Sequence, residues 1–108
     1  MKFYEFGNEH KILLACFDTF PVGFIGYGKG DDSKSVYIEP MMVDSSFQQK
    51  RISSKVLEIF EQRIRDLKYE EITLGHRTDN ITAAIAYEKA GYVLTKVDGL
   101  SSYRHKIL

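Results

Sequence analysis

The segment DNITAAIAYEKAGY, residues 79–92, carries a signal for local structure and a signal for chemistry. It is typical of a short helix, because Asp79 or Asn80 can cap its start and Gly91 suits the left-handed position after its end. Asn80 and Tyr87 lie about two helical turns apart, so we expect both side chains on one helix face. A tyrosine in this place packs in the core or donates a proton to a leaving group, and the residues alone leave both roles open.

On either side of this segment the hydrophobic pattern alternates between the strand period and the helix period. Apolar residues at helical spacing predict a long helix over 52–68. In it, Glu61 and Arg65 are one turn apart and predict a weak surface pair. The remaining predicted elements are strands at KFYEF (2–6), HKILLACFD (10–18), VGFIGYG (22–28), SVYIEPMMV (35–43), EEITLGH (70–76), YVLTKV (92–97) and SSYRHKI (101–107), and the short helix at ITAAIAYEKAG (81–91).

This order predicts the fold class. A run of antiparallel strands, then helix, strand, helix and a closing hairpin indicates an α/β (α+β) fold with a mixed, mainly antiparallel central sheet flanked by helices. We expect one domain over residues 1–108 with one three-layer core. Pro40 lies inside the strand 35–43, where it removes a ladder donor, so a bulge or an interrupted edge is expected there.

The composition narrows the classes of function. The 108 residues are 44% hydrophobic and 28% charged with a formal net charge of zero, which predicts a globular chain and gives no reason to expect nucleic acid. No apolar stretch is long enough to span a bilayer, so we expect a soluble cytoplasmic protein without a membrane partner. Cys16 lies in ILLACF and is interpreted as a buried, inert thiol. The histidines His10, His76 and His105 have no paired spacing, so no metal site is predicted.

A second candidate site lies where the strand 35–43 meets the long helix. A helix N-terminus leaves backbone N–H groups unpaired and carries a partial positive charge, and phosphate is a natural partner for both. Hydrogen-bond donors and positive charge surround this point at Gln48, Gln49, Lys50 and Arg51. A solvated loop that merely precedes a helix explains the same residues, so the pattern alone leaves the two interpretations open.

Taken together, the two segments resemble the GNAT N-acetyltransferases, which transfer an acetyl group from acetyl-CoA to an amine. The family motif N-x-x-A-x-x-x-Y-E-K-x-G-[FY] is matched at Asn80, Ala83, Tyr87, Glu88, Lys89, Gly91 and Tyr92. The family's cofactor loop, V-x-P-x-[YF]-[RQ]-x-x-G-x-[GA], is matched less fully by VDSSFQQKRIS at residues 43–53, through Val43, Phe47, Gln48 and Ile52. The resemblance covers roughly residues 11–97.

Two departures from the family pattern affect what the resemblance implies. Arg51 and Ser53 replace the two glycines that let the loop backbone approach the CoA pyrophosphate. Arg51 adds bulk there, although its guanidinium can itself bind phosphate, so we expect it to act as a phosphate contact. The family also places a strand and two helices before the central hairpin, whereas only a short segment precedes 10–18 here. The resemblance therefore implies an acceptor cleft that is open or closed by a second subunit.

The resemblance implies that acetyl-CoA binds in an opening between the strands 35–43 and 70–76. The backbone at Met41, Met42 and Val43 would hold the pantetheine arm and polarise the thioester carbonyl. The remaining expected contacts with acetyl-CoA are Gln48, Gln49, Lys50, Arg51, Ile52, Ser53 and Ser54 around the phosphates, and Asn80, Ala83 and Tyr87 along the arm. No metal is implied.

The same resemblance assigns the proton transfers. Tyr87 would return a proton to the departing thiolate, and Glu39 is the candidate base that takes the proton of the acceptor amine. His76 is the second candidate base, because histidine exchanges protons near neutral pH. A solvent-facing glutamate and a structural histidine are the alternatives.

The function predicted from these features is an N-acetyltransferase for a primary amine. The amine belongs to a small molecule, a peptide N-terminus or a lysine side chain. The alternative is a degenerate GNAT-like module that binds a partner or CoA without turnover. The seven Tyr and seven Phe residues give a small body much aromatic surface, so we expect a homodimer.

Overall fold

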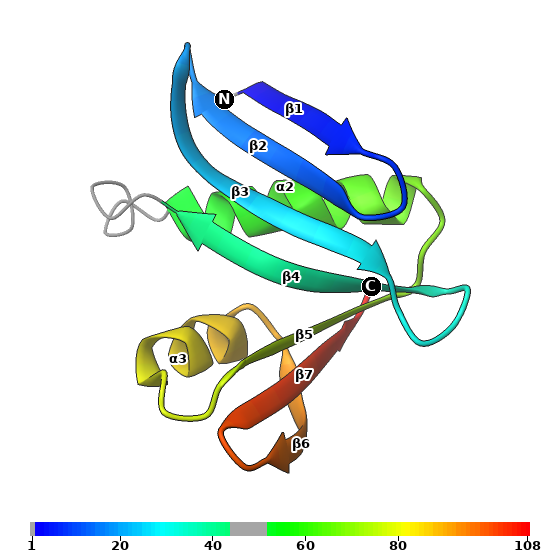
Figure 1. Cartoon of the computed structure of the whole chain (residues 1–108), viewed down its shortest axis with the longest axis vertical. Helices are drawn as coiled ribbons and strands as arrows, with labels where there is room; N and C mark the ends of the chain where they lie inside the picture. Colours follow the sequence, from blue (N-terminus) through cyan, green and yellow to red (C-terminus); the bar gives the residue numbers. More distant parts are fainter. Residues whose placement is uncertain (1, 44–51) are drawn as a thin grey trace.

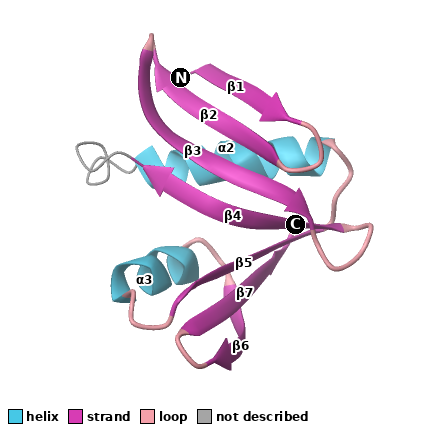
Figure 2. Ribbon diagram, viewed as in Figure 1, coloured by secondary structure: helices cyan, strands magenta, loops and turns pink. Residues whose placement is uncertain are grey.

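The computed structural model describes residues 2–43 and 52–108. Its elements are β1 (Lys2–Gly7), β2 (Lys11–Phe17), β3 (Phe20–Lys29), β4 (Ser35–Val43), α2 (Ile52–Asp66), β5 (Glu71–Arg77), α3 (Ile81–Lys89), β6 (Val93–Asp98) and β7 (Ser101–Ile107). These strands form one seven-stranded sheet in the order β1-β2-β3-β4-β5-β7-β6 (Figure 1). Within it, β4 and β5 pair in parallel and the other neighbours pair antiparallel. The predicted mixed, mainly antiparallel sheet with helices is confirmed (Figure 2).

Both described helices pack on the same face of this sheet. Leu74 of β5 is buried in one cluster with Phe60 of α2. His76, two residues further along β5 and so on the same face, stacks on Tyr87 of α3. The expected three-layer core is therefore wrong for residues 2–43 and 52–108, which form two layers. The sequence pattern does not show this, because it gives which residues of a helix are apolar but not which sheet face they cover.

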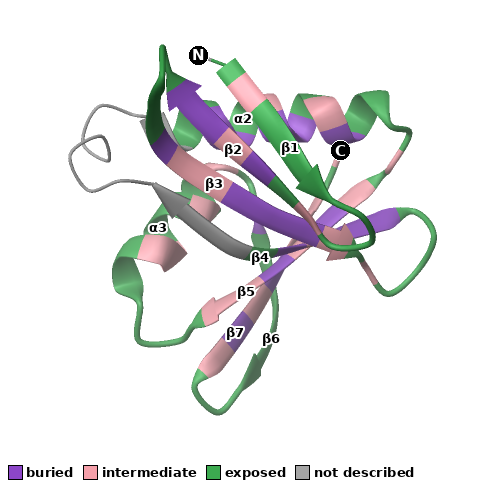
Figure 3. Ribbon diagram, turned by 45° about the horizontal axis from the view of Figure 1, so that its top comes forward, coloured by how far each residue is buried: buried purple, intermediate pink, exposed green. Residues whose placement is uncertain are grey.

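Helix α2 supplies the apolar stripe that covers the sheet. Val56, Phe60 and Ile64 follow each other at four-residue spacing and are almost fully buried. The ring of Phe60 meets Tyr27 of β3 edge to face, with 5.1 Å between the ring centroids. Figure 3 shows the resulting distribution, with buried segments on β2, β3 and α2 and exposed ribbon on β1 and β6. Cys16 of β2 is buried, as the sequence predicted.

A buried polar cluster joins α2 to the end of α3 and to β7. Glu61 accepts a hydrogen bond from the Tyr92 hydroxyl at 2.8 Å and an ion-paired one from Lys106 Nζ at 3.0 Å. Lys106 Nζ also donates to the backbone carbonyl of Ala90 at 2.8 Å. Glu61 is thus a buried residue, and its interpretation as half of a surface pair with Arg65 is wrong. Helical spacing places Glu61 and Arg65 near each other. It gives no information about partners from distant segments, which here are Tyr92 and Lys106.

The turn before β3 is tighter than the sequence predicted. Asp18 adopts a left-handed φ of 52°, and the chain reverses there so that Phe17 pairs with Phe20. Strand β3 consequently begins at Phe20 rather than at residue 22. Pro21 lies opposite Cys16, where the register shifts, which is a place where a strand tolerates proline.

Candidate active site

Strand β4 is irregular at its centre. The register places Glu39 and Pro40 opposite the single residue Gly26, because the pairing with β3 shifts between Ile25 and Tyr27. Two residues opposite one define a β-bulge, and a proline without an N–H group accounts for its position. The bulge predicted from Pro40 is confirmed.

The pairing of β4 with β5 ends where this bulge begins. Their last paired residues are Ile38 and Leu74, and beyond them the two strands diverge (Figure 1). Residues 41–43 pair with β3 only, so their backbone groups on the β5 side have no strand partner within the described residues. Backbone N–H and C=O groups in that situation are available to a ligand. These are Met41, Met42 and Val43, the residues expected to hold the pantetheine arm.

The first turns of both helices lie at the end of the molecule where the strands diverge (Figure 1). Helix α2 starts at Ile52 and includes Ser53 and the exposed Ser54. The predicted phosphate contacts Gln48, Gln49, Lys50 and Arg51 fall outside the described residues. What the structure shows is a helix N-terminus, with its unpaired N–H groups, close behind the end of β4.

The ends of α3 explain most of the motif in residues 80–92. The Asn80 side chain accepts a hydrogen bond from the Ala83 backbone N–H at 3.1 Å and so caps the helix. Gly91 adopts a φ of +94° after the helix, and the N–H of Tyr92 donates to the Tyr87 carbonyl at 2.9 Å. This is a Schellman C-cap, and the rings of Tyr87 and Tyr92 supply its apolar contact, 5.8 Å apart. The motif therefore defines a helix as well as a possible site.

Tyr87 lies on the helix-covered face beside β5. Its ring stacks on His76 with 5.9 Å between centroids, and burial raises the pKa of its hydroxyl. The phenol is therefore protonated near neutral pH, as a proton donor requires, although burial also makes it a weaker acid than an exposed tyrosine.

His76 has protein partners at both ring nitrogens. Nε2 accepts a hydrogen bond from Arg104 Nε at 3.1 Å, and Nδ1 lies 2.8 Å from the Arg77 carbonyl oxygen. Because the guanidinium only donates and the carbonyl only accepts, the geometry assigns the proton to Nδ1. His76 thus orients Arg104 and supports the ring of Tyr87.

Glu39 lies at the bulge on the other face of the sheet. It follows the buried Ile38 in the strand and is exposed, so it points away from the helices. Two residues earlier on the same face, Tyr37 has a raised pKa, chiefly from burial and then from the negative charge of Glu39. The divergence of β4 and β5 is therefore flanked by Glu39 on one face and by Tyr87 on the other.

The family comparison gives this arrangement an identity. Residues 2–92 match the model of the acetyltransferase (GNAT) family. The chain belongs to the GNAT family. The resemblance stated from the two motifs is confirmed, and the divergent strands correspond in position to the opening that the resemblance implied.

Solved GNAT structures share the fold. The PaiA N-acetyltransferase from Thermoplasma acidophilum, in complex with coenzyme A, superposes with a TM-score of 0.82 at 20% identity over 90% of this chain and 60% of that one. A GNAT acetyltransferase from Elizabethkingia anophelis with acetyl-CoA bound gives a TM-score of 0.82 at 14% identity over 93% and 77% of the two chains. An acetyltransferase from Thermus thermophilus gives 0.84 at 15% identity over 93% and 65%. The chain thus spans less than two thirds of the length of the Thermoplasma and Thermus proteins.

No curated protein matches the sequence. In the part of the chain that the structure describes, no cluster of three or more His, Cys, Asp or Glu side chains is arranged to hold a metal ion. Within residues 2–43 and 52–108, none of the helices is long and apolar enough to cross a membrane.

Tyr37 and Tyr103 are residues near the site that the sequence did not single out. Tyr103 pairs with Gly75 of β5 and therefore lies on the same face as Tyr37 and Glu39. The strand period would have found Tyr37, because it precedes Glu39 by two residues in one strand. Tyr103 is brought there only by the pairing of β7 with β5, which no local pattern shows.

Proposed function

We propose that the protein is an acetyl-CoA-dependent N-acetyltransferase that acts on a primary amine. The observation that carries this proposal is the opening between β4 and β5, with an exposed carboxylate, Glu39, on one face and a protonated phenol, Tyr87, on the other. Transfer of an acetyl group needs a base for the nucleophile and an acid for the leaving group on opposite sides of the reacting carbonyl. The location of Glu39 and Tyr87 on opposite faces of the opening supports this assignment of roles.

The described residues also fit the cosubstrate. Within residues 2–43 and 52–108, the backbone of residues 41–43 makes no ladder hydrogen bonds on the side of the opening, and the N-terminus of α2 is close by for phosphate. Acetyl-CoA supplies an activated thioester. Backbone N–H groups at residues 41–43 would hydrogen-bond the carbonyl oxygen as negative charge develops on it.

The chain's own groups then move the protons. Glu39 takes a proton from the acceptor ammonium, which frees the nitrogen lone pair to attack the acetyl carbon, and passes this proton to solvent. The new C–N bond forms and the nitrogen gives its second proton to Glu39, while the C–S bond breaks and Tyr87 donates its phenolic proton to the sulfur. An N-acetylated amine and CoA leave, the proton held by Glu39 returns to Tyr87 through solvent, and one proton is released overall. His76 takes no part, because both of its nitrogens are engaged by protein groups.

The first test is binding of acetyl-CoA, measured as a thermal shift. A ligand at a hundred times its Kd adds about 2.7 kcal/mol of stability when it binds the folded state only. No shift at millimolar acetyl-CoA contradicts the proposal. A shift that desulfo-CoA reproduces but 3′-dephospho-CoA does not would trace part of the affinity to phosphate contacts.

The second test is Tyr87→Phe, with release of free CoA thiol as the readout. The phenyl ring keeps its packing on Tyr92 and His76, while the proton donor is lost. General-acid assistance is worth about 10²–10⁴ in rate, so kcat falls by that factor with little change in acetyl-CoA affinity. An unchanged kcat would leave Tyr87 as a core residue only.

A second candidate function is a GNAT-like module that binds CoA or a partner without turnover. The observation that favours it is the sequence of the cofactor loop, where Arg51 and Ser53 replace glycines. A thermal shift with acetyl-CoA combined with no acetyl transfer to any amine would select this module over the enzyme.

We also propose that the protein is cytoplasmic and forms a homodimer through the sheet face that the described helices leave uncovered. Tyr4, Phe6 and Ile12 of β1 and β2 lie on that face with 46%, 57% and 41% of their surface exposed. Adjacent aromatic and aliphatic side chains of this kind are common at interfaces. Light scattering at micromolar concentration tests it, and Phe6→Ser should shift the mass toward the monomer. A monomeric wild-type mass rejects the dimer.

A further inference from the structure

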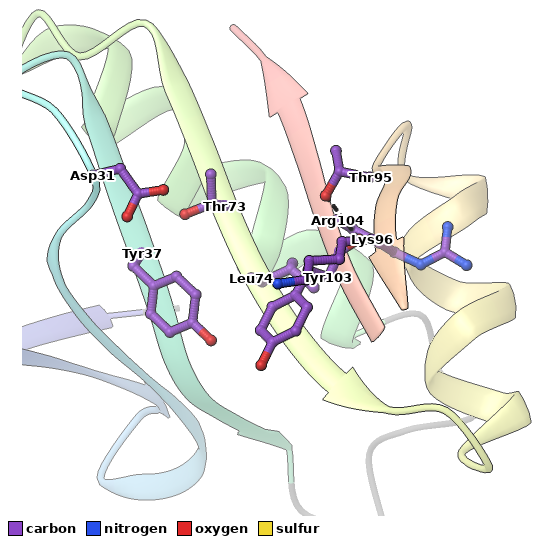
Figure 4. Close-up of a pocket in the computed structure, with 8 residues that line it drawn as sticks. All are labelled: Asp31, Tyr37, Thr73, Leu74, Thr95, Lys96, Tyr103 and Arg104. Atoms are coloured by element: carbon purple, nitrogen blue, oxygen red, sulfur yellow. Dashed lines mark hydrogen bonds between the residues drawn. The ribbon is translucent and has the colours of Figure 1, made fainter. Parts of the chain in front are cut away.

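The helix-free face holds a cavity that the proposed reaction has not used. Its volume is about 300 Å³, and β4, β5 and β7 form its floor. Its polar lining residues are Asp31, Tyr37, Thr73, Thr95, Lys96 and Tyr103, which Figure 4 shows as sticks. Because it lies on the face of Glu39, it is placed to receive the acceptor rather than acetyl-CoA.

One end of the cavity lies at the opening between the strands. A Cβ atom on Gly75 would lie 2.9 Å from the Tyr37 hydroxyl oxygen and 3.3 Å from the Tyr103 ring, so both tyrosines converge on Gly75. Gly75 immediately follows Leu74, the last β5 residue that pairs with β4. The two hydroxyls therefore point to the place where the strands separate, and the Tyr37 hydroxyl is within electrostatic reach of Glu39.

Neither tyrosine hydroxyl is satisfied by the part of the chain that the structure describes. None of the described residues makes a hydrogen bond with the hydroxyl of Tyr37 or Tyr103, although both side chains are partly buried. A larger residue at position 75 would come into close contact with the Tyr37 hydroxyl and displace it, so the glycine leaves room for this convergence. Two half-buried hydroxyls directed at one point are suited to hydrogen-bonding a polar group of a ligand.

Lys96 brings a positive charge into this cavity. It pairs with Tyr103 across β6 and β7, so both side chains lie on the same face, and Figure 4 shows the Lys96 side chain extending toward Tyr103. Across residues 2–43 and 52–108, Lys96 has neither an ion pair nor a side-chain hydrogen bond. Arg104 also lines the cavity, but its guanidinium is engaged with His76 and the Tyr92 carbonyl on the other face.

Asp31 lies across the cavity from Lys96, on the β4 side and away from the tyrosine hydroxyls (Figure 4). A ligand whose anionic group reached across the cavity would approach this carboxylate. The cavity therefore presents hydroxyls at the opening, a cation on its β6 side and an anion on its β4 side. An anionic group is favoured only at a short distance from the group bound by the tyrosines.

We propose that the acceptor is a small primary amine that carries an anionic group, a carboxylate or a phosphate, a few bonds from its nitrogen. Tyr37 and Tyr103 hold the amine at the opening, where Glu39 takes its proton, and Lys96 binds the anion. Lys96 is thus a specificity-determining residue. This inference rests on the proposed acetyltransferase function and adds the substrate class to it.

The test uses four amines with acetyl-CoA and the full chain. β-Alanine and O-phosphoethanolamine carry an anion, ethanolamine carries none, and 1,3-diaminopropane carries a second cation. A hydrogen bond to a charged group contributes about 10–100-fold in affinity, so kcat/KM for an anionic amine should exceed that for ethanolamine by about that factor. The ratio of kcat/KM for β-alanine to kcat/KM for O-phosphoethanolamine identifies whether the site prefers a carboxylate or a phosphate.

Variants separate the role of Lys96 from a structural one. Lys96→Gln should remove the advantage of the anionic amines by raising their KM, and Lys96→Arg should restore it. Lys55→Gln, which removes an exposed lysine of α2, is the matched control and should leave the amine preference as in the wild type. A preference of Lys96→Gln for β-alanine as strong as the wild type's overturns the assignment.

The remaining outcomes distinguish this inference from the proposed function. Equal use of ethanolamine, or a preference for 1,3-diaminopropane, overturns the substrate class while acetyl transfer stands. If no amine is acetylated, saturation-transfer NMR measures directly whether β-alanine binds to the protein. Binding that Lys96→Gln abolishes would support the cavity and reject turnover, whereas no binding to the wild type would reject both.

Discussion

The two faces of the sheet are built differently. On the face covered by α2 and α3, side chains such as Val22, Ile25 and Phe60 are fully buried. Among the described residues, no buried side-chain polar atom lacks a hydrogen bond. On the other face, Tyr37 and Tyr103 leave their hydroxyls without a partner in residues 2–43 and 52–108, and Tyr4 and Phe6 remain exposed.

The difference indicates that one face of the sheet serves stability and the other serves ligand binding. Fully packed positions stabilise the fold, because burial of apolar area is the dominant favourable term in folding. Half-buried polar groups without partners contribute little to stability and are available for ligands. Substitutions on the covered face should therefore change stability first, and substitutions on the open face should change activity first.

The largest expected effect is that of Phe60→Ala. It removes a fully buried ring that packs on Tyr27, and such changes cost about 3–5 kcal/mol. Urea denaturation followed by circular dichroism measures it. Ile107→Ala, at an exposed position of β7 on the open face, is the control and should stay within about 0.5 kcal/mol. Similar losses for both variants would abolish the contrast between the faces.

Lys106→Met should have the next largest effect. It removes the ion-pair partner of the buried Glu61 and leaves that carboxylate with only the Tyr92 hydroxyl, which costs about 1–3 kcal/mol. Lys34→Met breaks an exposed pair with Glu70 and should cost less than about 1 kcal/mol. The same denaturation experiment compares them, and an equal loss would show that burial does not matter for these pairs.

Alkaline pH should weaken the covered face. Burial, followed by the charge of Glu61 and the hydrogen bond to it, raises the pKa of Tyr92. Below about pH 10 the phenol is protonated in both states; above it, only the unfolded chain loses the proton. Stability then falls as pH rises, by about 1.4 kcal/mol per pH unit for each such group. Unfolding free energies at pH 9 to 11 should fall less steeply in Tyr92→Phe, and parallel slopes would contradict the assignment.

The smallest effect on stability should come from Tyr37→Phe on the open face. The ring remains, and no hydrogen bond to a described residue is lost, so the unfolding free energy should change by less than about 0.5 kcal/mol. Its KM for the acceptor amine should nevertheless rise several-fold. A large loss of stability without a change in KM would move Tyr37 from the cavity to the core.

Local patterns predicted what depends on local residues. The elements, the cap at Asn80, the left-handed Gly91 and the bulge at Pro40 follow from residue types that act within a few positions. Tertiary partners were not predictable in this way. Glu61 looked like a surface residue because its partners, Tyr92 and Lys106, come from distant segments.

The site shows the same limit. Tyr87 was proposed through the family motif and Glu39 through its place on the strand that enters the implied cleft, and the structure shows them on opposite faces of one opening. His76 was a candidate base from its residue type. Its ring nitrogens are engaged by the distant Arg104 and by the carbonyl of the neighbouring Arg77, and the sequence pattern shows neither contact. The cavity beside Tyr37 combines residues from β4, β5, β6 and β7, so the sequence of no single segment predicts it.

The parallel pair of β4 and β5 has a consequence for folding. It joins only residues 35–38 to residues 71–74, yet it is the ladder that connects the β1–β4 meander to the rest of the sheet. The pairs within the β1–β4 meander and the β6–β7 pair form between strands that are neighbours in sequence. The β4–β5 ladder must instead close a loop across α2, and the β5–β7 ladder one across α3 and β6, which is slower. We expect the meander to form early and the two halves to join late. A molecule that binds where β4 and β5 diverge would contact both halves of the sheet and would slow their separation.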